Sequence, residues 1–133
     1  MFIDRLSHCE RQILMDLLIH VARCDKEFSQ EERSYIDNIG IKYNLKVPFE
    51  PERSVEALCQ AITEYQSKVI ILQELIRLAK IDNDYHQEER DVVEDVIEYF
   101  DIKYEKYLAL KRWVDAGIQW LKDGEKHISD DDV

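Results

Sequence analysis

The stretch DKEFSQEER at residues 25–33 recurs as DNDYHQEER at residues 82–90, which is 57 positions later. The same offset brings apolar positions of the two halves into register without a gap, as in the pairs Ile13/Ile70, Leu18/Leu75, Ala22/Ala79, Phe28/Tyr85 and Ile39/Val96. Self-similarity at a fixed period is typical of a duplicated supersecondary unit. The sequence therefore predicts two copies of one helix–loop–helix unit, at residues 6–44 and 63–101.

Length and composition predict one all-α domain. The chain has 133 residues, of which 45% are hydrophobic, and it contains 3 glycines and 2 prolines. So few residues that break regular structure favour long helices over strands joined by turns. Apolar residues spaced three and four apart are typical of amphipathic helices. We expect about six helices, near residues 3–24, 29–44, 55–62, 63–79, 86–100 and 101–124.

Several residues are candidates for the ends of these helices. Ser29 with Glu32 and Thr63 with Gln66 have the spacing of a capping box, in which each residue binds the backbone amide of the other. Asp101 is a plausible cap for the last helix. Gly124 is its expected end, with a seventh helix if the chain breaks near Gly117. The domain is thus predicted at residues 1–124, followed by a poorly ordered polar tail at 125–133.

The net charge excludes some partners. The chain carries 18 basic and 29 acidic residues, a net charge of −11. Such a surface repels phosphate backbones and anionic lipids, so we expect no nucleic acid and no membrane partner. The 3 cysteines lack CxxC spacing, which favours reduced thiols and a cytoplasmic protein.

The duplicated acidic residues are the main candidate site. If the two units pack about a pseudo-twofold axis, their loops bring Asp25 and Glu32 toward Asp82 and Glu89. Both aspartates follow a predicted helix C-terminus, where the helix dipole disfavours a carboxylate by about 0.3–1 kcal/mol. Oxygen ligands of this kind suit Ca²⁺, Mg²⁺ or Mn²⁺. Second-line contributors are Asp84, Glu31 and Glu88.

A purely structural interpretation remains open for the same residues. Glu32 is explained by the capping box, and the two aspartates can close Asx-turns. In the second copy His86 replaces the capping serine, yet Glu89 is kept. Capping therefore explains Glu32 better than it explains Glu89.

Nothing in the sequence indicates catalysis. It contains no glycine-rich phosphate loop, no GxSxG elbow and no HExxH motif. We therefore expect a protein that is not an enzyme.

The repeated loop resembles the TerB tellurite-resistance family. That family's core reads approximately Ala-Asp-Gly, an apolar residue, Ser and then acidic residues. In the first copy the motif corresponds to Ala22, Asp25, Phe28, Ser29, Glu31 and Glu32. In the second copy it corresponds to Ala79, Asp82, Tyr85, Gln87, Glu88 and Glu89. Lys26 and Asn83 depart from the family's glycine.

The resemblance implies a TerB-type helical fold, a cytoplasmic module related to stress or tellurite resistance, and clustered acidic residues that bind a metal cation. The alternative is a helical protein-interaction scaffold with an unidentified protein partner and no metal site. Such a scaffold could be a homodimer formed through Trp113 and Trp120, which lie seven residues apart on one helix face.

Overall fold

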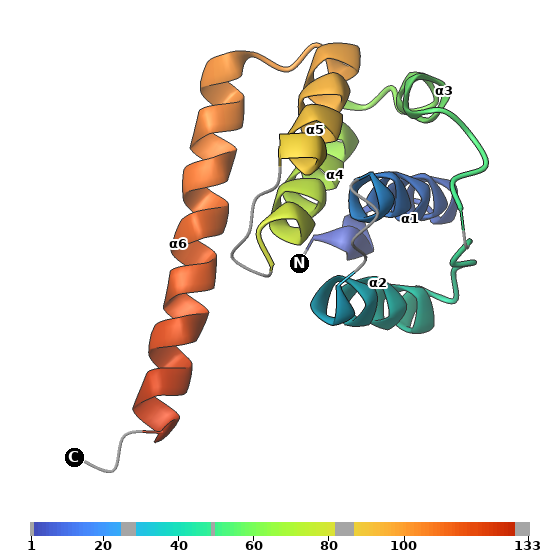
Figure 1. Ribbon diagram of the computed structural model, residues 1–133. Coiled ribbons are helices and arrows are strands. Elements are labelled where there is room, and N and C mark those ends of the chain that lie inside the picture. The colour runs from blue at the N-terminus through green and yellow to red at the C-terminus, as the bar shows by residue number, and fades with distance from the viewer. Residues whose placement is uncertain (1, 25–28, 49, 82–86, 130–133) are drawn as a thin grey trace. The chain divides into compact units, whose positions relative to one another are not determined.

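The computed structural model describes residues 2–24, 29–48, 50–81 and 87–129, and within these it contains helices and no strand. The side chains of Gln87 and Glu88 are not described. The predicted all-α class is thereby confirmed. In chain order the elements are the 3-10 helix η1 (Ile3–Arg5), α1 (His8–Arg23), α2 (Gln30–Tyr43), α3 (Val55–Gln60), α4 (Tyr65–Ala79), α5 (Gln87–Phe100) and α6 (Tyr104–Ser129) (Figure 1).

The chain divides into two compact units, unit 1 (Met1–Ile102) and unit 2 (Lys103–Val133). Unit 1 holds the two hairpins α1/α2 and α4/α5 together with α3, and unit 2 holds α6. Their charges differ. Unit 1 has 12 basic and 22 acidic residues, a net charge of −10, whereas unit 2 has 6 and 7, a net charge of −1.

The helices of unit 1 repeat with the offset found in the sequence. The bounds of α5 are those of α2 moved by 57 residues, and α4 starts 57 residues after α1. Asn44 and Asp101, also 57 apart, have left-handed φ values of 53° and 55°. The next residue in each half, Leu45 or Ile102, then donates its N–H to a carbonyl five residues back, at 2.9 and 3.0 Å. The two hairpins therefore end in the same way.

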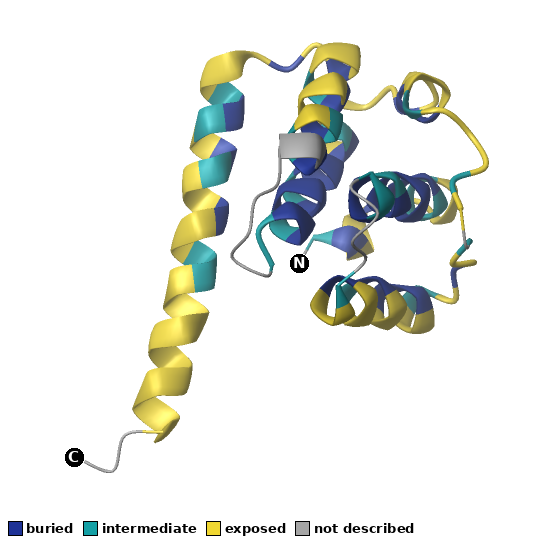
Figure 2. Cartoon of the chain, in the orientation of Figure 1, coloured by how far each residue is buried: buried dark blue, intermediate teal, exposed yellow. Residues whose placement is uncertain are grey.

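The core of unit 1 is built on α1 and α4. Helix α1 contacts α2, α3, α4 and α5, so it is the central element. Its apolar stripe is completely covered, as Figure 2 shows by colour. The largest side chains from α1 and α4 that are less than 2% exposed are Leu14, Met15, Leu17, Leu18, Ile19, Ile71, Leu72, Leu75, Ile76 and Leu78. Shortening one of these to alanine typically costs about 2–5 kcal/mol.

Four predicted helix ends were wrong. The first helix was expected from residue 3, but α1 begins at His8, after the separate 3-10 helix η1. Thr63 does not cap α4, because the N-cap residue is Glu64, which makes no side-chain cap hydrogen bond. Asp101 is the left-handed residue that follows α5, and α6 begins only at Tyr104. Helix α6 runs without a break through Gly117 and Gly124 to Ser129. A glycine costs only about 1 kcal/mol in a helix, which the good helix formers around it offset.

No helix in the described part of the chain is long and apolar enough to cross a membrane.

Candidate functional site

Helix α2 begins with the predicted capping box. The Glu32 amide donates to Ser29 Oγ at 3.1 Å, and the Ser29 amide donates to Glu32 Oε1 at 3.2 Å. Ser29 has the extended backbone of an N-cap, with φ −66° and ψ 159°. The Glu32 side chain is only 1% exposed. The reciprocal hydrogen bonds and the positive end of the helix dipole together stabilise this buried carboxylate.

Glu89 occupies the same position in α5. It is the third residue of that helix, as Glu32 is the third residue of α2, and it is also 1% exposed. Fully buried carboxylates are rare in proteins and need hydrogen bonds or charged partners. Both halves of unit 1 therefore place a buried carboxylate in the first turn of their second helix.

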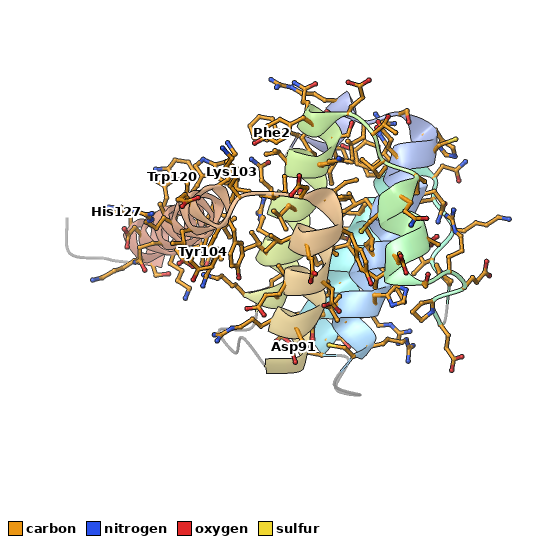
Figure 3. All side chains as sticks on the ribbon, turned by 90° about the horizontal axis from the view of Figure 1, so that it is seen from above. Phe2, Asp91, Lys103, Tyr104, Trp120 and His127 are labelled. Carbon is orange, nitrogen blue, oxygen red and sulfur yellow. The ribbon has the colours of Figure 1, made fainter. Side chains whose placement is uncertain are left out.

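The two first turns lie at the same end of unit 1. In Figure 3 the starts of α2 and α5 are both found at the end where Asp91 is labelled. In the chain, α2 follows α1 and α5 follows α4. The two predicted site glutamates, Glu32 and Glu89, are thus carried by helix starts at one end of the unit.

The aspartates of the predicted site lie outside the described residues. These are Asp25, Asp82 and Asp84, and the side chain of Glu88 is likewise not described. Glu31 is exposed. Among the residues whose placement is described, no three His, Cys, Asp or Glu side chains are grouped so that they could hold a metal ion. The metal site therefore remains a prediction, because it requires Asp25 and Asp82.

A second polar feature of unit 1 was missed in the sequence. The Tyr35 hydroxyl on α2 donates to Glu74 Oε2 on α4 at 2.5 Å, and Glu74 is 2% exposed. Burial, followed by the Glu74 charge and hydrogen bond, raises the pKa of Tyr35 well above its usual 10.0, so the phenol stays protonated as a donor. The two side chains line a surface pocket of about 200 Å³, which Lys42 and Arg77 also border.

A signal for Glu74 did exist in the sequence. It stands within the apolar stripe of α4, and its counterpart 57 residues earlier is the fully buried Leu17. An acidic residue at a core position needs a partner, and Tyr35 is one. The sequence alone does not say which residue on another helix that partner is.

Asp16 on α1 is a fourth buried acid, 7% exposed, and its role is structural. Its Oδ2 atom accepts a hydrogen bond from Arg53 Nη2 at 3.1 Å. The neighbouring Gln12 exchanges two hydrogen bonds with the backbone of Lys46, at 2.9 and 3.1 Å. These contacts fasten the proline-containing connection between α2 and α3 to α1.

Unit 1 is therefore an all-helical unit with buried carboxylates at the starts of two equivalent helices. Such carboxylates can accept backbone hydrogen bonds or bind a hard cation. Comparisons with models of known protein families, with curated proteins and with solved structures found no match for the chain.

Proposed function

We propose that the chain is a small, non-enzymatic cytoplasmic module of the TerB type that binds one divalent cation between its two repeated loops. The observation that carries this proposal is the equivalence of Glu32 and Glu89. Both are third in their helix and both are 1% exposed. Burial of a carboxylate costs free energy of folding. Its presence in both copies of the unit favours a common function for Glu32 and Glu89.

Further support comes from the repeat itself. The matching bounds of α2 and α5, and the left-handed residues Asn44 and Asp101, favour an internal duplication of one hairpin. The two helix starts lie at one end of unit 1 (Figure 3), and Asp25 and Asp82 each stand five residues before one of them in the sequence. Four carboxylates and a net charge of −11 suit Ca²⁺, Mg²⁺ or Mn²⁺, since these cations prefer oxygen ligands. A role in stress or tellurite resistance follows from the family resemblance alone.

The second candidate is a protein-interaction scaffold without a metal site. Specific observations favour it too. The capping box gives Glu32 a structural role, and α6 carries large apolar side chains with high exposure, with Trp120 at 74% and Ile128 at 86%. In that case the acidic residues serve capping and solubility only.

Thermal unfolding with and without cations separates the two candidates. The protein is first stripped with a chelator, and Ca²⁺, Mg²⁺ and Mn²⁺ are then titrated against NaCl of equal ionic strength. A specific site gives saturable stabilisation that differs between cations, about 2.7 kcal/mol at a hundredfold excess over the dissociation constant. An equal response to all three cations and to NaCl is charge screening and rules the site out.

Substitution of the acidic residues tests whether the stabilisation by cations comes from the proposed site. Asp25→Asn and Asp82→Asn should each abolish the cation response. Glu32→Gln is the sharper variant, because glutamine also completes a capping box but lacks the charge. It should keep the stability of the metal-free protein and lose the cation response. The control is Asp95→Asn, an exposed acid on α5, which should leave the response unchanged.

A further inference from the structure

The surface pocket beside Tyr35 and Glu74 lies between three elements of unit 1. It is lined by Ile3 from η1, by residues of α2, and by Glu74 and Arg77 from α4, and Figure 1 shows η1 between α2 and α4. Its volume is about 200 Å³, which is below the roughly 300–1,000 Å³ of sites for drug-sized ligands. A ligand that fits this pocket is therefore a compact molecule.

Hydrogen bonds hold the η1 wall of the pocket in place. Arg11 on α1 donates to the backbone carbonyls of Ile3 and Asp4, at 3.1 and 2.9 Å. The Tyr43 hydroxyl on α2 donates to Asp4 Oδ1 at 2.7 Å, and the Arg11 guanidinium carbon lies 4.6 Å from the centre of the Tyr43 ring. The wall is thus fixed by contacts that need no ligand, so the pocket is already formed in the free protein.

Two basic side chains border the pocket, Lys42 from α2 and Arg77 from α4. Neither forms a salt bridge with any residue that the structure describes, although unit 1 has 22 acidic and only 12 basic residues. Lys42 Nζ instead lies 5.3 Å from the centre of the Tyr43 ring. With Glu74, the lining carries two positive side chains and one negative side chain, a net charge of +1. This charge favours an anion with a single negative charge.

The duplicated fold does not explain the two basic residues. With the offset of 57 positions, Lys42 corresponds to Tyr99 and Arg77 corresponds to His20. The buried Ile39, which also lines the pocket, has an apolar counterpart in the other hairpin. The apolar part of the lining is therefore common to both copies, whereas the positive charges belong to this pocket alone.

The donors of the pocket suit a carboxylate. The guanidinium of arginine can donate two parallel hydrogen bonds to the two carboxylate oxygens, and the ammonium of lysine adds a charged donor. The exposed amide of Asn38 is a further donor in the lining. Ile3 and Ile39 provide apolar surface against which the body of a ligand can pack.

Other ligand classes are disfavoured by the same residues. A cation is repelled by the basic side chains of Lys42 and Arg77. A dianion such as phosphate is repelled more strongly than a monoanion by the Glu74 carboxylate in the pocket wall. A neutral apolar molecule leaves both basic groups without a partner.

We propose that this pocket binds a small organic monocarboxylate with a compact apolar body. Lys42 and Arg77 hold its carboxylate, and its body packs against Ile3 and Ile39. The ligand contacts η1, α2 and α4 at once, so it stabilises the folded protein. The pocket shares no residue with the proposed cation site, so failure of either proposal leaves the other intact.

Titration of the full chain with sodium benzoate, followed by two-dimensional amide NMR, tests the proposal. Benzoate added up to about 20 mM, against NaCl of equal ionic strength, should give saturable shifts at the amides of the lining segments, residues 35–43 and 74–77. Benzyl alcohol, which has the same ring but no charge, should bind about tenfold or more weakly. Inorganic phosphate should also bind more weakly than benzoate.

Lys42→Gln and Lys46→Gln are a matched pair of variants. Both lysines are exposed and they stand four positions apart, but only Lys42 lines the pocket. Lys42→Gln should raise the dissociation constant for benzoate about threefold, as expected for an exposed charged contact, and Lys46→Gln should leave it unchanged. Arg77→Gln, at a half-buried position, should raise it about tenfold.

Several results would overturn the proposal. Shifts that grow linearly with benzoate and do not saturate, or that are spread over the surface, mean that no specific site exists. Equal affinity for benzyl alcohol, or higher affinity for phosphate, contradicts recognition of a monocarboxylate. Equal effects of Lys42→Gln and Lys46→Gln mean that benzoate responds only to the net charge of the protein.

Discussion

The hydroxyl of Tyr35 on α2 lies 2.5 Å from a carboxylate oxygen of Glu74 on α4 and donates a hydrogen bond to it. The two residues are 39 positions apart and belong to different hairpins of unit 1. Glu74 is 2% exposed, in the stripe where the first hairpin has Leu17. The hydrogen bond therefore joins the two hairpins through Glu74, at a position where the first hairpin has an apolar leucine.

Replacing Tyr35 by phenylalanine should destabilise the protein. A hydrogen bond to a buried charged group contributes about 1.5–3 kcal/mol, and the variant removes the donor while the carboxylate stays buried. Denaturant unfolding should show a loss in that range with an unchanged m value. Tyr43→Phe is the control, because the Tyr43 hydroxyl binds the exposed Asp4 at 2.7 Å and should contribute much less.

A double variant separates the hydrogen bond from packing. Tyr35→Phe/Glu74→Leu replaces both partners by apolar groups, with leucine as at the corresponding position of the first half. Replacing both partners can be nearly neutral, so the double variant should recover most of the stability that Tyr35→Phe loses. A double variant that is less stable than Tyr35→Phe would contradict this account.

The same contact predicts how stability depends on alkaline pH. Burial and the Glu74 charge raise the pKa of Tyr35 in the folded protein above 10.0, its usual value in an unfolded chain. Above that pH the unfolded chain loses the proton first, so the stabilisation is complete below pH 10.0 and is lost as the pH rises further. The difference in unfolding free energy between wild type and Tyr35→Phe should therefore stay constant up to about pH 10 and shrink as the pH rises further.

Other tyrosines do not obscure this measurement. The pKa values of Tyr43 and Tyr99 are raised as well, first by desolvation. Their contribution is common to wild type and Tyr35→Phe, so it cancels in the difference. A difference that stays constant to pH 11 would mean that Tyr35 ionises with equal ease in the folded and the unfolded chain.

The left-handed backbone of Asp101, the residue after α5, predicts that this position tolerates glycine better than valine. Asp101 has φ 55°, a conformation that glycine adopts freely and that costs other residues about 1–2 kcal/mol. Asp101→Gly should therefore be neutral or stabilising, while Asp101→Val should lower the unfolding free energy by about that amount or more. Asp95→Val, at an exposed position inside α5, is the control and should cost only a few tenths of a kcal/mol. Equal losses for the two valine variants would contradict the assigned backbone.

Much of the helical architecture could be predicted because it depends on local rules. Apolar residues at three- and four-residue spacing identify α1, α2, α4 and α5, and the Ser29–Glu32 box marks the start of α2. The same Ser-x-x-Glu pattern at Ser7 and Glu10 caps α1 and could have been used in the same way.

The errors arise where small local preferences compete or where the partner is distant. Gly124 is only mildly unfavourable in a helix, so it did not end α6. Thr63 and Gln66 have the spacing of a capping box, yet α4 starts after Glu64. The partner of Glu74 lies on another hairpin, and no local rule connects residues 35 and 74. Within the candidate site, the sequence predicted Glu32 and Glu89 as a pair, while Asp25 and Asp82 lie outside the described residues.

Gly40 on α2 predicts a coupling with Val47 in the connection that follows the helix. A Cβ atom added at Gly40 would lie 2.7 Å from Val47 Cγ2, closer than real contacts allow. Gly40→Ala gains about 1 kcal/mol of helix propensity, but it must displace Val47, and overpacking of this kind costs about 1–3 kcal/mol. We expect Gly40→Ala to destabilise the wild type and to stabilise a Val47→Ala background, where the methyl group is absent. Denaturant unfolding of the four proteins gives the coupling energy, which should be about 1 kcal/mol or more. Additive effects would mean that Val47, which is 41% exposed, moves aside without cost.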